Sequence, residues 1–384
     1  MEPTFADDVA LMKKHFDVIV LREGDARVAV APALQGRVMT SSAAGDNGPG
    51  FGWINREFIA AGKTVPQINV YGGEDRLWLG PEGGQFSIFF SKGAEFEFKN
   101  WQTPALIDTV PFDVQPEKAA NVARFQKRAK LTNYSGTEFD IELDRSVSLL
   151  SPVNVAEFLD AQFPAGIKQV AYQTQNTLTN KSDKSWSKQT GLLSVWILGM
   201  YKPGPETTVV VPFKKGSEAE LGPKVIDDYF GKVPADRLVV RDDVLFFNGD
   251  GKQRGKIGLT PLRAVPVMGS YDAKAGLLTI VQYTKPEGVT DYVNSKWEIQ
   301  EKPFAGDVVN SYNDGPPAPG AKPLGPFYEL ESSSPARELR PGESVQHTHR
   351  TIHLQGSEAA LEPIARKMLG VSITDIKSAL PKQK

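Results

Sequence analysis

Groups that can transfer protons gather near the C-terminus of the chain. The segment 327–332 has the alternating pattern of a strand and contains two glutamates, Glu329 and Glu331. In a strand these two side chains point to the same face, about 7 Å apart. Paired carboxylates on one face are a common source of general acid and base chemistry.

The following segment adds imidazoles. After a turn at Pro341-Gly342, a period of two places His347, His349 and His353 on one face of the next strand, and these are three of the four histidines in the chain. Imidazoles exchange protons near neutral pH. We therefore predict a shared acid–base site that contains Glu329, Glu331, His347 and His349.

Two other interpretations of these residues stay open. The histidines are also compatible with an ordinary solvated sheet face. Alternatively, His347-x-His349 and a glutamate are ligand types that suit zinc, manganese or iron. We leave the presence of a metal open and expect no cofactor.

A second group of candidates lies in residues 69–85. The paired glycines Gly72-Gly73 allow close approach of a ligand to the backbone. Around them, Glu74, Arg76, Trp78 and Glu82 combine charged hydrogen-bonding groups with an aromatic plate. Sugars require that mixture, although a tight turn beside a core tryptophan has the same composition. We add Asn313, which precedes the glutamate strand, as a further candidate for ligand binding.

Composition excludes several classes of function. The chain has 384 residues with 44 Lys and Arg against 46 Asp and Glu, so it lacks the basic excess expected of a nucleic-acid-binding protein. It contains no cysteine, which excludes disulfides, thiolate nucleophiles and cysteine-ligated metal sites. We expect a carbohydrate ligand and no nucleic-acid partner, and leave the oligomeric state open.

Neither a membrane span nor a leader is expected. The longest apolar stretches are much shorter than the ~20 residues that cross a bilayer. Residues 1–16 carry acids and a lysine pair where a signal peptide has an apolar core. We leave the compartment open, and a periplasmic location with the leader removed is one option.

The elements that must position these residues are mostly strands. Glycine and proline, 35 and 28 residues, are spread along the chain, which is typical of many short elements. Between them the period is mostly two, as where Phe139, Ile141 and Leu143 alternate with charged residues. We predict an all-β, mainly antiparallel fold in a single domain over 1–384, with short helices near 5–16, 223–230 and 357–369.

With these segments identified, the chain resembles the galactose mutarotase-like superfamily, in particular its uncharacterised bacterial members. The segments that carry the resemblance are Gly36-Arg37, Gly72-Gly73, Arg76–Trp78, Pro81-Glu82, Lys256–Gly258, Glu329–Glu331 and Leu339–Glu343. The resemblance implies a β-supersandwich with a carbohydrate cleft on a concave face. It also implies that Glu331, in competition with Glu329, matches the general base of aldose 1-epimerases.

The chain departs from the characterised epimerases in one respect. Those enzymes use mid-chain histidines as general acid, and this chain has none between His15 and His347. We therefore expect a carbohydrate-active protein with epimerase-like chemistry, an isomerase activity in which a terminal-strand histidine replaces the missing acid. The alternatives are a glycan-binding protein without catalysis and a metal-dependent enzyme that uses the His-x-His strand.

Overall fold

Strands make up most of the regular structure, as the alternating pattern predicts. The computed structural model describes residues 2–164, 166–318 and 320–381. Along β7 (Glu138–Leu149) every second residue is buried, beginning with Phe139, and the residues between them are more exposed. Such alternation is typical of antiparallel sheets with one face in the core. The expected ends of the domain, residues 1 and 384, lie outside the described residues.

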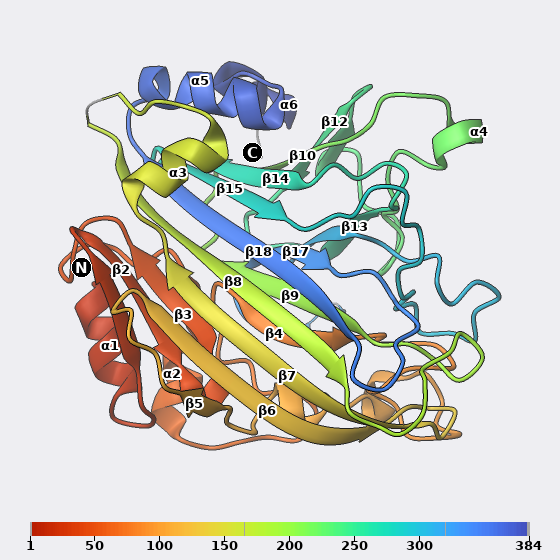
Figure 1. The fold of residues 1–384 in the computed structure, drawn as a ribbon. Helices are drawn as coiled ribbons and strands as arrows, with labels where there is room; N and C mark the ends of the chain where they lie inside the picture. The colour runs from red at the N-terminus through yellow and green to blue at the C-terminus, as the bar shows by residue number, and fades with distance from the viewer. Residues whose placement is uncertain (1, 165, 319, 382–384) are drawn as a thin grey trace.

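Two antiparallel sheets form the two main layers, with the larger in front of the smaller in Figure 1. In spatial order, the ten strands of the larger sheet are β11 (Leu238–Val240), β12 (Val244–Asn248), β10 (Thr207–Pro212), β14 (Val267–Asp272), β15 (Leu277–Tyr283), β18 (Ser344–Gln355), β8 (Lys168–Asn180), β7, β6 (Val122–Thr132) and β5 (Asp113–Gln115). The five strands of the smaller sheet are β13 (Gly255–Leu259), β16 (Val309–Asn313), β17 (Tyr328–Ser333), β9 (Ser194–Tyr201) and β4 (Arg76–Gly80). A third sheet, near the N-terminus, contains β1 (Ile19–Glu23), β2 (Ala26–Ala31) and β3 (Arg37–Ser42).

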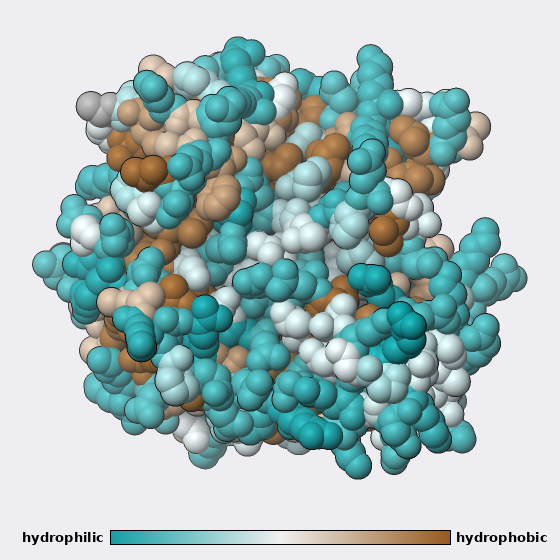
Figure 2. Space-filling model, in the orientation of Figure 1, coloured by the Kyte–Doolittle hydropathy of each residue, from teal (hydrophilic) through white to brown (hydrophobic). Residues whose placement is uncertain are grey.

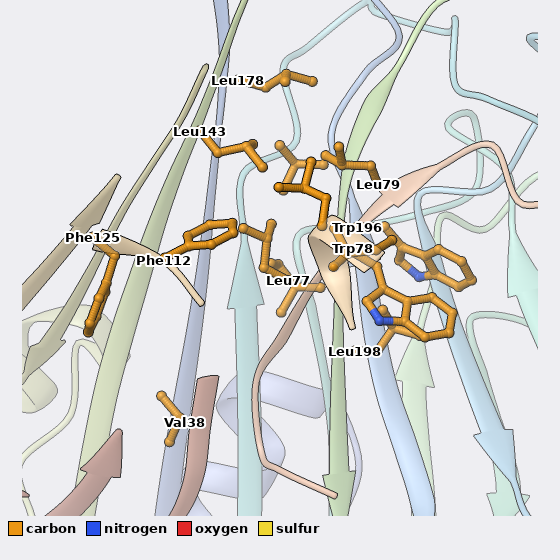
Figure 3. Close-up of a cluster of buried hydrophobic side chains, with 14 of the residues drawn as sticks. Val38, Leu77, Trp78, Leu79, Phe112, Phe125, Leu143, Leu178, Trp196 and Leu198 are labelled. Carbon is orange, nitrogen blue, oxygen red and sulfur yellow. The ribbon is translucent and has the colours of Figure 1, made fainter. Parts of the chain in front are cut away.

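The main core fills the space between the layers. Leu143 of the larger sheet and Leu77 of the smaller sheet belong to one buried cluster. Figure 3 shows Leu77 on one side of β4 and the rings of Trp78 and Trp196 on the other, as strand alternation requires. The outward face of the larger sheet is mainly hydrophilic in Figure 2.

Helices cover the sheets only at their margins. Leu361 of α5 (Glu358–Leu369) and Ile373 of α6 (Ile373–Ala379) pack with α3 (Pro152–Leu159) against one end of the larger sheet, at the top of Figure 1. The described residues also contain the α-helices α1 (Phe5–Met12), α2 (Arg56–Ala61) and α4 (Glu218–Leu221), and the short 3-10 helices η1 (Pro32–Leu34), η2 (Phe98–Asn100) and η3 (Ala105–Ile107). None of the helices in the described residues is both long and apolar enough to cross a bilayer.

Helices form in two of the three expected places. α1 and α5 lie within the predicted ranges 5–16 and 357–369, and α5 continues through Pro363. The helix predicted at 223–230 is wrong. There the backbone of Ile226 exchanges hydrogen bonds with Gly258, so this segment is held against the edge strand β13.

The strands β17 and β18 belong to different layers. The sequence predicted two successive strands with a turn at Pro341-Gly342 between them, and a site that both strands share. Instead, β17 pairs with β16 and β9 in the smaller sheet, and β18 pairs with β15 and β8 in the larger sheet. The connection 334–343 therefore crosses between layers, and this crossing decides which candidate residues meet.

Candidate functional site

A pocket of about 790 Å³ opens on the outward face of the smaller sheet. Its aromatic lining residues are Phe98, Trp196, Tyr229, Phe230, Trp297 and Tyr312. Its ionisable lining residues are Glu82, Asp228, Arg254, Lys256, Lys296, Glu298, Asp307, Asp314, Lys322 and, through their hydroxyls, Tyr229 and Tyr312. The pocket is lined both by side chains of strands and by the loops that precede or follow those strands.

Strand register places both C-terminal glutamates on this outward face. Directly opposite Glu331 lie Asn310 on one side and Leu198 on the other, and Leu198 in turn lies opposite Arg76. Directly opposed residues share a face of a sheet. Asn310 lines the pocket, so the row that contains Glu331 and Arg76 lies on the pocket side of the sheet.

Glu331 lies behind the wall of the pocket. Its side chain is fully buried, and its Oε2 accepts hydrogen bonds from Trp196 Nε1 at 3.0 Å and from Lys256 Nζ at 2.9 Å. The Lys256 ammonium also lies 4.8 Å from the centre of the Trp196 ring. Glu331 Oε1 has no hydrogen-bond partner among the described residues. Lys256 and Trp196 thus lie between Glu331, the expected base, and the pocket. Of the ion pair, only Lys256 lines the cavity.

Glu329 forms a second buried ion pair, with Arg76. Burial raises the pKa of the Glu329 carboxyl, and the Arg76 guanidinium opposes that shift. Arg76 also lies 4.9 Å over the Trp78 ring, and that ring packs edge-on against Trp196 at 5.6 Å. Arg76 and Trp78, expected to hold a sugar, therefore support the floor of the pocket from below and are not among its lining residues.

Two of the carboxyl groups that line the pocket, Glu82 and Asp307, lie next to strands on opposite sides of β17 in the smaller sheet. Glu82 follows β4, and burial raises its pKa, with Lys256 opposing and Glu331 adding to the shift. Asp307 precedes β16, and burial raises its pKa to about 7, helped by the negative charge of Glu331. Asn310 Nδ2 donates to Asp307 Oδ2 at 3.1 Å, while Asp307 Oδ1 has no partner among the described residues. Asp307 can therefore hold a proton near neutral pH.

The sequence pointed to Glu82 but missed Asp307. Asp307 lies in a loop with no alternation to mark its direction. Its only sequence signal is its position just before the polar segment 310–314.

The histidines lie on the other side of β17, between the two sheets. Ser332 Oγ is 2.8 Å from both His347 Nε2 and His349 Nδ1, and Ser332 points away from the face that carries Glu331. Burial lowers the pKa of His347 to about 3 and that of His349 to about 4, so both rings are neutral. The expected hollow shared by Glu331 and these imidazoles is therefore a wrong prediction, because β17 separates them.

Two other candidates have their polar atoms bound within the protein. Glu74 is fully buried between the layers, where its Oε2 lies 3.1 Å from His353 Nε2 and its carboxylate accepts hydrogen bonds from Ser41. Asn313 accepts a hydrogen bond from the backbone of Gly251 and donates to the carbonyl of Gln253. The structure thus brings Glu82 into the pocket and keeps Glu74 and Asn313 out of it.

A metal site would require several ligands at one point. Among residues 2–164, 166–318 and 320–381, no group of three His, Asp or Glu side chains is arranged to hold a metal ion. His347 Nε2 and His349 Nδ1 both have the Ser332 hydroxyl as their hydrogen-bond partner.

Comparison with known proteins places the chain in a family. Residues 3–380 match a family of unknown function, DUF6786. The chain belongs to the DUF6786 family. No curated protein is significantly similar to this member.

Several solved structures resemble this DUF6786 protein. The Slr1438 protein from Synechocystis has a TM-score of 0.52 and 13% identity, over 89% of this chain and 96% of that one. A putative aldose 1-epimerase from Escherichia coli has a TM-score of 0.47 and 10% identity, over 89% of this chain and 99% of that one. A galactose mutarotase-like protein from Lactobacillus casei has a TM-score of 0.46 and 12% identity, over 88% of this chain and 100% of that one. The resemblance to galactose mutarotase-like proteins is thus confirmed for the fold, and identities this low concern the fold alone.

Proposed function

We propose that the pocket on the smaller sheet binds a carbohydrate and catalyses proton transfer at its anomeric centre. The observation that carries this proposal is the pairing of aromatic faces with carboxyl groups of raised pKa in one cavity. Trp196 and Trp297 offer apolar surfaces for sugar rings, while Asp307, Asn310 and Lys256 offer hydrogen-bonding groups for hydroxyls. The names of the epimerase-like neighbours agree with this ligand class.

The chemistry is interconversion of anomers. One carboxylate takes the proton from the O1 hydroxyl, a carboxylic acid gives its proton to the ring oxygen O5, and the C1–O5 bond breaks to leave an open-chain aldehyde. Rotation about C1–C2 and the reverse proton transfers close the other anomer, so no proton or electron is lost. Asp307, with a pKa raised to about 7, is suited to donate to O5, and Glu82 in its ionised form is the matching base.

In this proposal Glu331 is a positioning residue. Because Lys256 and Trp196 both bind its Oε2, Glu331 fixes the ammonium group and the indole ring that face the sugar. This role replaces the role of base suggested by the family resemblance, since Glu331 lies behind the side chains that would touch the substrate.

Exchange spectroscopy by NMR on a panel of free aldoses tests the proposal. We expect the protein to accelerate anomer exchange of at least one sugar, and the Asp307→Asn variant to lower kcat/KM for exchange about 100-fold or more. Asp242→Asn is the matched control, because Asp242 is a surface aspartate paired with Lys215 and Lys224. Exchange that is unchanged in Asp307→Asn would contradict the assigned role.

A second candidate function is glycan binding without turnover. It is favoured by the position of Glu331, which the family resemblance would make the base and which the pocket wall shields. Under this alternative, calorimetry detects sugar binding, but exchange spectroscopy detects no acceleration for any sugar that binds.

A further inference from the structure

Large apolar side chains gather at the mouth of the pocket. Phe98, Phe230 and Leu324 all line it and keep 55%, 45% and 42% of their surface exposed. Isolated exposed apolar residues are normal on protein surfaces, but a cluster around one opening marks a binding surface. These residues are distinct from Trp196 and Asp307, which lie deeper in the same pocket.

The ring of Phe98 is held in place from beneath. It stacks on Trp101 with ring centres 5.8 Å apart and planes 18° apart, and Trp101 stacks in turn on Trp297 at 6.0 Å and 22°. Gln67 Nε2 donates to the Phe98 carbonyl at 2.6 Å. A pre-positioned ring with one face covered and the other exposed is suited to stack on a planar or ring-shaped ligand.

Phe230 is supported in a different way. The Arg254 guanidinium lies 3.7 Å from the centre of its ring, and Tyr312 meets it edge-on at 5.9 Å. The segment that carries Phe230 is held to β13 through Ile226 and Gly258. Arg254 places hydrogen-bond donors beside an apolar ring, and sugar rings present hydroxyls beside apolar faces.

We propose that the mouth is a second sugar subsite and that the ligand is an oligosaccharide of at least two rings. One ring occupies the inner part of the pocket near Trp196 and Asp307, and the next lies between Phe98 and Phe230, where Arg254 binds its hydroxyls. The cavity volume of about 790 Å³ fits this assignment. Pockets for drug-sized ligands have volumes of about 300–1,000 Å³, and this cavity lies in the upper part of that range. The inference rests on the proposed carbohydrate function and adds the substrate class.

Calorimetric titration with matched sugars tests the inference. The probes are glucose with maltose and cellobiose, and galactose with lactose and β-1,4-galactobiose. For the sugar that binds, we expect the disaccharide to bind at least 10-fold more tightly than the monosaccharide. Phe98→Ala and Phe230→Ala should each lower that affinity ratio about 3- to 10-fold, the range expected for one aromatic contact.

Phe158→Ala is the matched control. Phe158 is 37% exposed and also lies under a guanidinium, that of Arg350 at 3.3 Å, but it belongs to α3 on the larger sheet. Its substitution should leave the affinity ratio unchanged. A ratio near one in the wild type, or a ratio insensitive to both Phe98→Ala and Phe230→Ala, would overturn the second subsite and leave the inner sugar site standing. If no sugar in the panel binds, the proposed function fails, and the subsite with it.

Discussion

At the scale of single residues, the Lys256 ammonium group links a buried carboxylate to the open pocket. Its partner Glu331 is fully buried, and the Lys256 side chain is 12% exposed. A buried carboxylate that loses its cation keeps its charge without a counterion, so this ion pair connects the stability of the sheet to the shape of the site.

Removing the cation should therefore be costly. We expect Lys256→Met to lower the free energy of unfolding by about 3–5 kcal/mol, because Glu331 is left buried without its partner. Adding Glu331→Gln should recover part of that loss. The control is Lys296→Met, which removes a half-exposed lysine 3.7 Å from Asp228 and should cost less than about 1 kcal/mol. Urea unfolding measures all four proteins, and equal losses for Lys256→Met and Lys296→Met would contradict the burial argument.

The Asp307 carboxyl gives a second prediction at this scale. Burial raises its pKa to about 7, so it is mostly protonated below that pH and loses its proton above it. If it is the proton donor, kcat/KM for anomer exchange should fall as the pH rises through about 7. The pH profile of Asp307→Asn should lack that falling limb, whereas Asp242→Asn should keep it. A limb that persists in Asp307→Asn would assign the titration to another group.

At the scale of elements, the separation of β17 from β18 sets the roles of the glutamates and histidines. Alternation along β17 sends Glu331 toward the pocket and Ser332 toward β18, where it meets His347 and His349. The two rings are neutral because burial disfavours their charged form. They therefore tie the two layers together without adding charge to the core.

This burial predicts an acid-sensitive stability. The folded-state pKa values of His347 and His349, about 3 and 4, lie below the usual value of about 6.5, so the unfolded chain binds more protons between these limits. Their contribution is fully present above pH ~6.5 and is lost as the pH falls, at ~1.4 kcal/mol per pH unit for each ring. Urea unfolding from pH 7 to pH 4 measures this slope.

A variant pair isolates the two histidines from the carboxyl groups that also titrate there. The double variant His347→Asn/His349→Asn should reduce the slope of the unfolding free energy against pH, by up to the equivalent of two bound protons. His15→Gln, which removes an exposed histidine outside the core, should leave it unchanged. Parallel slopes in the wild type and the double variant would show that the rings are not held neutral.

At the scale of the whole molecule, buried clusters between the layers join the sheets, and helices close one end. Leu361 and Ile364 of α5 are buried against strands of the larger sheet, far along the chain from the pocket loops. Because the larger sheet packs on the smaller one through Leu143 and Leu77, we propose that the chain folds as a single domain.

Coupled unfolding follows from that proposal. We expect Leu361→Ala to cost about 2–5 kcal/mol, since it opens a cavity under α5. The loss should appear equally in far-UV circular dichroism and in tryptophan fluorescence, although Trp78 and Trp196 lie in the other layer. Leu324→Ala, at an exposed position, should cost much less. Different unfolding midpoints from circular dichroism and from tryptophan fluorescence would contradict a single cooperative unit.

Sequence pattern predicts the local features of this molecule better than its long-range ones. Alternation correctly placed Glu329 and Glu331 on one face, because the direction of a side chain depends only on its own strand. It did not separate β17 from β18, since the partner of a strand is chosen by contacts distant in sequence. The same limit explains Asp307, whose role depends on a loop that the fold brings beside β13 and β17.

The most direct test of the account is a crystal structure with bound oligosaccharide. We predict a sugar ring over Trp196, with Asp307 within hydrogen-bonding distance of its ring oxygen and a second ring beside Phe230. A sugar bound only elsewhere, such as on the hydrophilic outer face of the larger sheet, would contradict the central claim.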